Sequence, residues 1–301
     1  IAAGESALAV AERLAALNLV SDAQLFRQFL RYNQLDVSIE AGDYTLRRNM
    51  NMKDIGAALQ KASFKEVVVT IPEGWRAEQI AEMLTGEEIM DGSEFLAVVR
   101  EGAAVEHNLL FDRPEGQSYE GYLFPDTYRL PVNATPADLI ERMLDNLAAK
   151  LPANTFDLAG RQNLSLYQVL TIASIVEREA VIAAERPTIA SVYLNRIAQN
   201  MYLQADPTVQ YAMGYQPESD QWWKTPVTLE EYSAINSPYN TYLNPGLPPG
   251  PIANPGIDSI VAVLEPADTN YLFFVAYGDG AHVFAETFEE HQSNVKIYQG
   301  Q

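Results

Sequence analysis

Apolar residues recur at helical spacing near two glycines of the N-terminal third. The segments 4–14 and 74–84 are identical at five of eleven positions at an offset of 70, and in each the apolar residues fall every three or four positions after the glycine. Both patterns predict a short extended segment, a turn and a helix. A β-branched run over residues 65–71 predicts a buried strand before the second helix.

The same reasoning predicts three further elements before residue 115. Residues 41–46 have the pattern of a turn that leads into a strand, residues 52–61 that of a helix, and a third helical stretch begins at Asp91. Turn-forming residues at 111–116 then break the pattern. We therefore expect an α+β organisation with region boundaries near residues 66 and 115.

A longer apolar helix is predicted from Ser165 towards Glu177 and Glu179. Ser165 and Gln168 have the spacing of a capping box, which fixes the start of this helix. The pattern places a second helix after Pro187. It places a third from Asp206 and Pro207 to near Gly214, so helices are expected to surround the two glutamates.

Two stretches are too rich in proline and glycine for regular structure. Residues 120–128 have the character of a packed loop beside a cleft. Residues 237–256 have that of an ordered functional loop, with a proline-rich linker as the alternative. Residues 271–285 predict a β-hairpin, and Thr287 with Glu290 caps a final helix. The expected regions are 1–66, 67–115 and 116–301, the last a mixed α/β domain with a helical core and a C-terminal hairpin.

The composition of the chain excludes several classes of function. The 301 residues carry a net charge of −20, which opposes binding to nucleic acid, and the absence of cysteine removes thiolate chemistry. His107, His282 and His291 lack the local spacing of a metal site. We expect no metal and no cofactor. No apolar run is long enough to cross a membrane, and the start at Ile1 is interpreted as that of a processed chain, so a signal or anchor would lie outside it.

Glu177 and Glu179 are the candidate catalytic residues. An apolar environment raises the pKa of a glutamate, and such a carboxyl group acts as a general acid near neutral pH. Glu177 and Glu179 diverge by about 200° on a helix, so only one faces a given cleft. The mechanism then uses one carboxylate, or a second one from elsewhere, for which Asp206, Asp126 and Glu120 are candidates. Aromatic and amide side chains around such a cleft suit a sugar.

Six ordered blocks carry a resemblance to a known family. They are residues 120–128 (EGYLFPDTY), 173–179 (ASIVERE), 203–209 (LQADPTV), 239–242 (YNTY), 246–252 (GLPPGPI) and 282–284 (HVF). Together they resemble the YceG-like endolytic murein transglycosylases, and residues 69–84 resemble the LysM-like element of that family. Neither a Gly-x-Ser-x-Gly nucleophile turn nor a phosphate-binding loop occurs in the sequence.

The resemblance implies a lytic transglycosylase, a lyase that cleaves the β-1,4 bond between N-acetylmuramic acid and N-acetylglucosamine and leaves a 1,6-anhydromuramoyl end. It implies Glu179 as the single acid and base and Glu177 as its support, with the reverse assignment left open. The substrate contacts or supports that it implies are Gln204, Asp206, Thr208, Asn240, Thr241 and Tyr242. For Asp206 a purely structural role as a helix cap is equally compatible with the sequence.

The resemblance further implies peptidoglycan strands as the partner and wall synthases as candidate partners. The expected location is the extracytoplasmic face of the cytoplasmic membrane, held by an N-terminal helix outside this chain. Two other functions stay open from the sequence. One is a non-catalytic scaffold that binds wall glycan, and the other is a lysozyme-type hydrolase with a second acid across the cleft.

Overall fold

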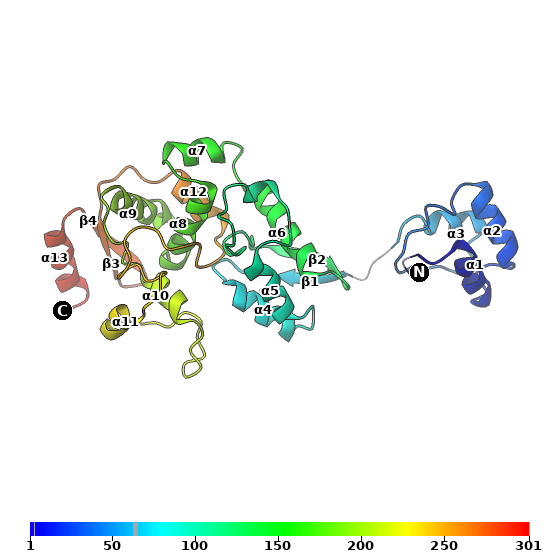
Figure 1. Cartoon of the computed structure of the whole chain (residues 1–301), viewed down its shortest axis with the longest axis horizontal. Coiled ribbons are helices and arrows are strands. Elements are labelled where there is room, and N and C mark those ends of the chain that lie inside the picture. Colours follow the sequence, from blue (N-terminus) through cyan, green and yellow to red (C-terminus); the bar gives the residue numbers. More distant parts are fainter. Residues whose placement is uncertain (3, 63–65, 301) are drawn as a thin grey trace. The chain divides into compact units, whose positions relative to one another are not determined.

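The computed structural model describes residues 1–2, 4–62 and 66–300, which form two compact units (Figure 1). Unit 1 comprises Ile1–Val67 with Arg129–Asn133, and unit 2 comprises Val68–Tyr128 with Ala134–Gln301. The boundary expected between residues 115 and 116 lies inside unit 2. The architecture is α+β, with helices and two small two-stranded sheets.

Unit 1 is a small helical body with its own core. Its helices are α1 (Ala7–Ala16), α2 (Ala23–Tyr32) and α3 (Met52–Ala58), and each begins at a capping side chain, Ser6, Asp22 or Asn51. Their apolar faces share one core, whose fully buried members include Val10, Ala11, Phe26, Leu30, Ile55 and Leu59. The helices expected over 7–14 and 52–61 are confirmed. The helix α2 was not predicted.

The strand expected within residues 41–46 is wrong. Gly42 and Ile1 exchange two backbone hydrogen bonds, with N–O distances of 2.9 and 2.7 Å, and Asp43 is the one bridge residue of this stretch. The phenol of Tyr44 donates to the carbonyl of Leu59, 3.2 Å away. Residues 41–46 therefore form a loop with a single bridge residue. The described residues before α1 form no strand either.

Strand β1 (Glu66–Thr70) lies where a strand was expected, but the expected burial is wrong, because only Val69 of its five residues is buried. It pairs with a second strand, β2 (Thr127–Pro131), in a two-stranded sheet, and each strand belongs partly to each unit. Between them lie α4 (Ala77–Gly86), α5 (Gly92–Glu101) and the short helix η1 (Asn108–Leu110). The packing of α4 against α5 buries apolar residues of both, and Asp91 caps α5 as expected.

Asn254 joins three distant segments within unit 2. Its side-chain oxygen accepts from the backbone N–H groups of Gly121 and Leu123, at 2.8 and 3.1 Å. Its amide nitrogen donates to Glu120 and to the carbonyl of Trp75, at 2.8 and 3.0 Å. This fully buried amide therefore fixes the loops at 74–76 and 120–124 against the proline-rich loop 237–256, which is irregular as expected and well packed.

Eight further helices lie between β2 and the C-terminal hairpin, and four of them pack on or beside one of their number, α8. They are α6 (Pro136–Lys150), α7 (Thr155–Arg161), α8 (Leu166–Glu179), η2 (Ala183–Glu185), α9 (Arg186–Ala198), α10 (Asp206–Met213), α11 (Leu229–Ala234) and α12 (Ile257–Leu264). Helix α8 has the predicted capping box at Ser165 and packs against α9, α12, α10 and α7 (Figure 1). Residues 166–176 are buried except Gln168, which is partly exposed, so the helix is fixed along most of its length up to its last turn.

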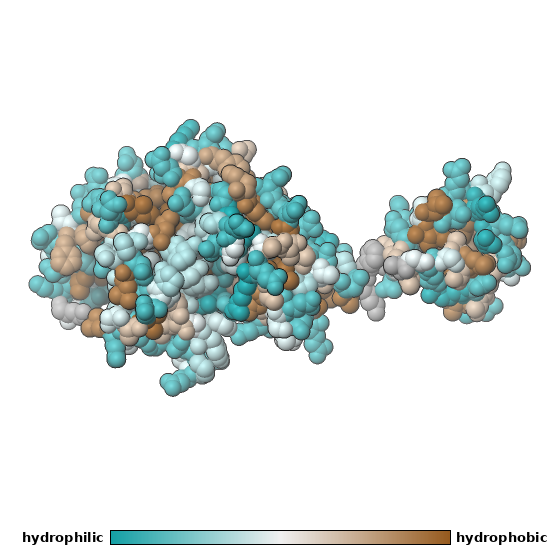
Figure 2. Space-filling model, in the orientation of Figure 1, coloured by the Kyte–Doolittle hydropathy of each residue, from teal (hydrophilic) through white to brown (hydrophobic). Residues whose placement is uncertain are grey.

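The predicted hairpin and final helix are confirmed. Strands β3 (Phe273–Tyr277) and β4 (Ala281–Ala285) pair antiparallel, with Phe274 opposite Phe284 and Ala276 opposite His282. Helix α13 (Phe288–Tyr298) packs on this hairpin and begins with the capping box of Thr287 and Glu290. On the face drawn in Figure 2, hydrophilic residues surround scattered hydrophobic ones in each unit. Within the described ranges, no helix is long and apolar enough to cross a membrane.

Candidate active site

Glu179 ends helix α8 at the wall of a cavity of about 420 Å³. The cavity is lined by residues of α8, α9, α10, the hairpin and α13, of the loop before α10 and of the loop 237–256, and by the residue after α13. They are Glu179, Tyr193, Arg196, Leu203, Gln204, Asp206, Tyr242, Phe274, Val275, Ala276, His282, His291, Val295 and Gln299. Because α8 is apolar up to Val176, the carboxyl group leaves a buried helix directly into this space. Desolvation raises the pKa of Glu179 to about 7.

Tyr193 of α9 is the hydrogen-bond partner of Glu179. Its hydroxyl donates to Oε1 of Glu179 at 2.8 Å, and its ring meets Phe274 of β3 edge-on, with centroids 6.0 Å apart. Burial raises the pKa of Tyr193 well above its ordinary value, so the phenol stays protonated and remains a donor. This bond lowers the pKa of Glu179 and therefore opposes part of the desolvation.

Asp206 lies in the same cavity and is held by two tyrosines. Its carboxylate accepts from the hydroxyl of Tyr242 at 2.6 Å and from that of Tyr232 at 2.9 Å, and the two rings stack with centroids 4.2 Å apart. The residue at the N-cap position of α10 is Ala205, and no side chain caps this helix end. The structural alternative for Asp206, a helix cap, is therefore wrong, since its oxygens point to tyrosines.

The other residues expected around the substrate divide into two groups. Gln204 and Tyr242 line the cavity with Asp206. Thr208, Asn240 and Thr241 are fully buried. Of these, Thr241 accepts from the N–H of Ala205 at 3.0 Å and contacts the hydroxyl of Thr208 at 2.9 Å, while Asn240 donates to the carbonyls of Tyr232 in α11 and of Ile235, which follows that helix. These three side chains are therefore engaged within the protein and do not line the cavity.

Glu177 points away from the cavity, as the helix geometry predicts. Its Oε2 accepts from the hydroxyl of Ser259 at 2.6 Å and from the N–H of Gly256 at 3.2 Å, and its Oε1 lies 3.6 Å from the guanidinium of Arg186. Only 8% of its side chain is exposed. Glu177 therefore joins the end of α8 to the start of α12 and to α9.

Two of the three candidates for a second acid lie outside the cavity. Glu120 is buried beneath α4, where its two oxygens accept from the N–H of Ala77 at 3.1 and 3.0 Å. Asp126 accepts from the side chain of Asn146 at 2.9 Å. Asp206 is the candidate that lines the cavity with Glu179, and its charge contributes to the raised pKa of Glu179.

Sequence reasoning missed several polar members of this site. Tyr193 was assigned only to the apolar face of a helix, and Arg196 was not singled out, although its guanidinium donates to the carbonyls of Leu272 and Leu203 at 2.6 and 2.7 Å. Glu185 was missed as well; it lies 2.7 Å from Nδ1 of His282. The family block at 282–284 marked His282, but a tyrosine at an apolar helical position has no local signal of its role.

Comparison with known proteins assigns the chain to a family. The model of the YceG-like family matches residues 1–297. The chain belongs to the YceG-like family. It is 32% identical to the endolytic murein transglycosylase of Bacillus subtilis (strain 168), over 99% of this chain and 83% of that protein. It is 31% identical to the endolytic murein transglycosylase of Streptococcus pneumoniae (strain D39), over 97% of this chain and 56% of that protein.

A solved structure resembles the whole chain. The crystal structure of a yceG-like protein from Listeria monocytogenes matches with a TM-score of 0.65 and 31% identity, and the match covers 97% of this chain and 96% of that one. The similarity therefore extends over nearly the whole length of both chains.

Proposed function

We propose that this YceG-like protein is a peptidoglycan lytic transglycosylase with Glu179 as its catalytic residue. One observation carries the assignment of Glu179. Its carboxyl group enters a cavity at the end of an apolar helix, its pKa is raised to about 7, and its neighbour Glu177 is engaged elsewhere. A glutamate protonated near neutral pH is what a general acid requires. The proposed substrate, peptidoglycan, follows from the relatives, which are named endolytic murein transglycosylases.

In the proposed reaction, Glu179 protonates the oxygen that joins N-acetylmuramic acid to N-acetylglucosamine. The carboxylate so formed accepts the proton of the muramoyl C6 hydroxyl, and that oxygen attacks C1 to close the 1,6-anhydro ring. The proton gained by the leaving oxygen equals the proton lost by the C6 hydroxyl, so no water is consumed. One carboxyl group serves both steps, and Tyr193 holds one of its oxygens in place throughout.

The rest of the cavity wall is assigned to substrate binding. Gln204, Asp206 and Tyr242 are proposed sugar contacts, and Thr208, Asn240 and Thr241 are proposed supports of the loops that present them. Residues 67–115, which include β1, α4 and α5, are proposed as a LysM-like region. Action outside the cytoplasm, a membrane anchor and contacts with wall synthases are part of the same proposal because the family resemblance implies them.

The decisive experiment is the analysis of products from purified glycan strands. Mass spectrometry should find fragments with new 1,6-anhydromuramoyl ends, produced by cleavage within the strands. The Glu179→Gln variant should produce none while retaining its fold. The Glu177→Gln variant is the matched control and should retain turnover per folded molecule. Loss of turnover in that variant alone would assign the acid to Glu177. The absence of any cleavage by the unaltered protein would favour the scaffold.

A second candidate function rests on Asp206. Its carboxylate lines the same cavity as Glu179, which is the arrangement that a lysozyme-type hydrolase needs. A hydrolase would leave reducing muramoyl ends that contain oxygen from water, so cleavage in ¹⁸O-labelled water separates the two reactions. We favour the lyase because both oxygens of Asp206 already accept from tyrosines. Label in the products would reverse this choice.

A further inference from the structure

Arg178 stands between Glu177 and Glu179 in the sequence, and its side chain has no hydrogen-bond partner among the described residues. Its guanidinium carbon lies 4.2 Å from the centroid of a ring of Trp223, and its Nε atom is buried without a partner. No ion pair to Arg178 occurs in the described part of the chain either. Its side chain is only partly exposed, and burial lowers its pKa from the usual arginine value. It remains charged.

Two other buried guanidiniums of unit 2 have protein acceptors. Arg196 donates to the carbonyls of Leu272 and Leu203, and Nε of Arg76 donates to Glu78 at 2.7 Å. A guanidinium carries five N–H donors, and a buried one without an acceptor, such as the Nε–H of Arg178, is costly. Since the guanidinium next to Glu179 in sequence has no acceptor among the described residues, the structure indicates that its acceptors come from a ligand.

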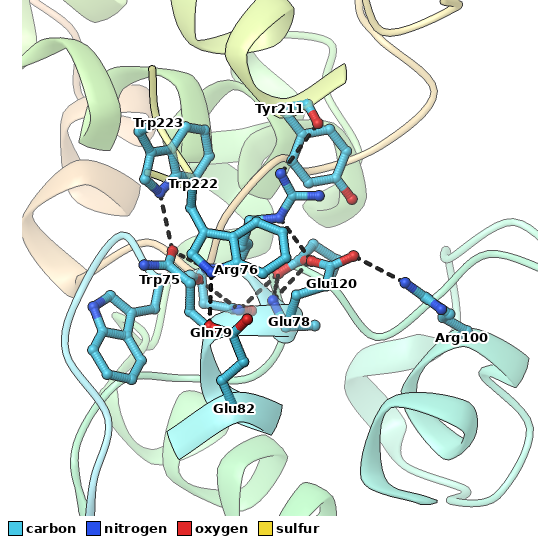
Figure 3. Close-up of polar contacts among 12 residues, drawn as sticks. Trp75, Arg76, Glu78, Gln79, Glu82, Arg100, Glu120, Tyr211, Trp222 and Trp223 are labelled. Carbon is cyan, nitrogen blue, oxygen red and sulfur yellow. Dashed lines mark hydrogen bonds and ion pairs between the residues drawn. The ribbon is translucent and has the colours of Figure 1, made fainter. Parts of the chain in front are cut away.

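The aromatic surface beneath Arg178 is fixed in position. The indole N–H of Trp223 donates to Gln79 of α4 at 3.0 Å, and that of Trp222 donates to Glu82 at 2.8 Å (Figure 3). A Cβ atom at Gly74 would lie 3.3 Å from a terminal nitrogen of Arg178, and the φ of +73° at that residue also favours glycine. The guanidinium therefore lies over the indole of Trp223 and close to the backbone of Gly74, and none of its N–H groups has an acceptor among the described residues.

A planar fork of N–H donors selects a carboxylate, which it binds through two parallel hydrogen bonds. Peptidoglycan carries carboxylates on the peptides attached to its muramoyl residues. A chain with a net charge of −20 repels such groups, so binding them near the reacting bond requires a dedicated cation. We propose that Arg178, stacked on Trp223, binds a carboxylate of the peptide on the muramoyl residue next to the bond that Glu179 cleaves. This inference rests on the proposed function.

The test compares two substrates and two proteins. Glycan strands with intact peptides are used as isolated and after chemical conversion of their carboxylates to carboxamides, and kcat and KM are measured for the unaltered protein and Arg178→Gln. The unaltered protein should show a KM roughly tenfold higher on the amidated strands, the loss expected for a charged hydrogen-bonded pair. The variant should show that higher KM on both substrates, with kcat retained.

The outcome that overturns the proposal is a fall in kcat of Arg178→Gln that is the same on both substrates, because Arg178 would then act through Glu179. Equal KM values for the variant and the unaltered protein on intact strands would also overturn it. Arg178→Lys keeps the charge without the fork and should give an intermediate KM. Arg100→Gln is the matched control, since that guanidinium is 63% exposed and paired with Glu78, and it should change neither constant.

Two further measurements keep the test decisive. If Arg178→Gln does not fold, Trp223→Leu removes the platform beneath the cation and should raise KM on intact strands only. If the unaltered protein cleaves neither substrate, the proposed function fails. The role of Arg178 is then decided by equilibrium binding, with weaker binding of the amidated strands as the supporting result and equal binding as the contrary one.

Discussion

The hydroxyl of Tyr193 donates a hydrogen bond to Oε1 of Glu179, and the oxygen–oxygen distance is 2.8 Å. Within the described part of the chain, it is the only protein group that hydrogen-bonds to this carboxyl group. One carboxyl oxygen is thus fixed by α9, and the other has no partner at the cavity wall. The pair links the orientation of the proposed acid to its proton affinity, since the same bond lowers the pKa of Glu179.

The first prediction concerns the pH dependence of activity. Because Glu179 must be protonated to start the reaction and its pKa is raised to about 7, kcat/KM should fall as the pH rises through about 7. Initial rates of strand cleavage between pH 5 and pH 9 measure this limb. A profile that is flat across this range, or that falls already near the ordinary glutamate pKa of 4.5, would contradict the assignment.

The second prediction is the effect of Tyr193→Phe. Loss of the hydrogen bond removes an influence that lowers the pKa of Glu179, so the alkaline limb should move to higher pH. The loss of orientation should reduce kcat about tenfold, in proportion to one hydrogen bond to a charged group. The pH profile of the variant is the measurement. Tyr215→Phe, which removes an exposed hydroxyl bonded to Asp220, serves as the control, and a limb that stays in place would refute the effect.

The third prediction concerns stability. The folded protein binds the Glu179 proton more tightly than the unfolded chain does, because the pKa rises from 4.5 to about 7. Between these two values the folded state holds more protons, so its stability falls as the pH rises and the cost is complete above about 7. The cost is about 3 kcal/mol at most. Glu179→Gln should therefore be more stable than the unaltered protein at pH 8.

Urea unfolding at pH 5 and pH 8 measures this difference. The gain of Glu179→Gln over the unaltered protein should be largest at pH 8 and should shrink towards pH 5, where the native carboxyl group is protonated. A variant that is less stable at pH 8 would show that Glu179 contributes to folding rather than opposing it.

The fourth prediction separates Glu177 from Glu179. Glu177→Gln weakens the bonds from Ser259 and Gly256 and leaves Arg186 without its carboxylate, so it should destabilise the fold by about 1–3 kcal/mol. Urea unfolding reports the change. Ser259→Ala, which removes one donor only, should cost less. An unchanged stability of Glu177→Gln would mean that the three contacts contribute little.

The fifth prediction concerns Asn254. Asn254→Ala leaves the backbone N–H groups of Gly121 and Leu123 without a partner in a buried site and removes one of the donors to Glu120, so it should cost more than about 3 kcal/mol. Asn244→Ala is the matched control, because its amide also bonds to carbonyls of a loop but at an exposed position. A similar cost for both variants would exclude a special role for Asn254.

Local sequence patterns predicted the elements whose signals are local. The capping boxes at Ser165 and Thr287 fixed the starts of two helices, and the alternation over residues 271–285 indicated the hairpin. Patterns that depend on a distant partner were less informative. Residues 41–46 resemble a strand but contain only one bridge residue. Strand β2 begins in the last two residues of the segment 120–128, which was expected to be an irregular loop.

The sequence alone determined that Glu177 and Glu179 point in different directions, because the angular spacing of helical residues is fixed by backbone geometry. It also marked, through four of the six family blocks, segments that contribute residues to the cavity wall. Only the tertiary structure decided which glutamate faces the cavity, that Tyr193 holds it, and that Arg178 rests on Trp223. Desolvation and hydrogen bonding depend on what packs around a residue, and those neighbours are brought together by the fold from distant segments.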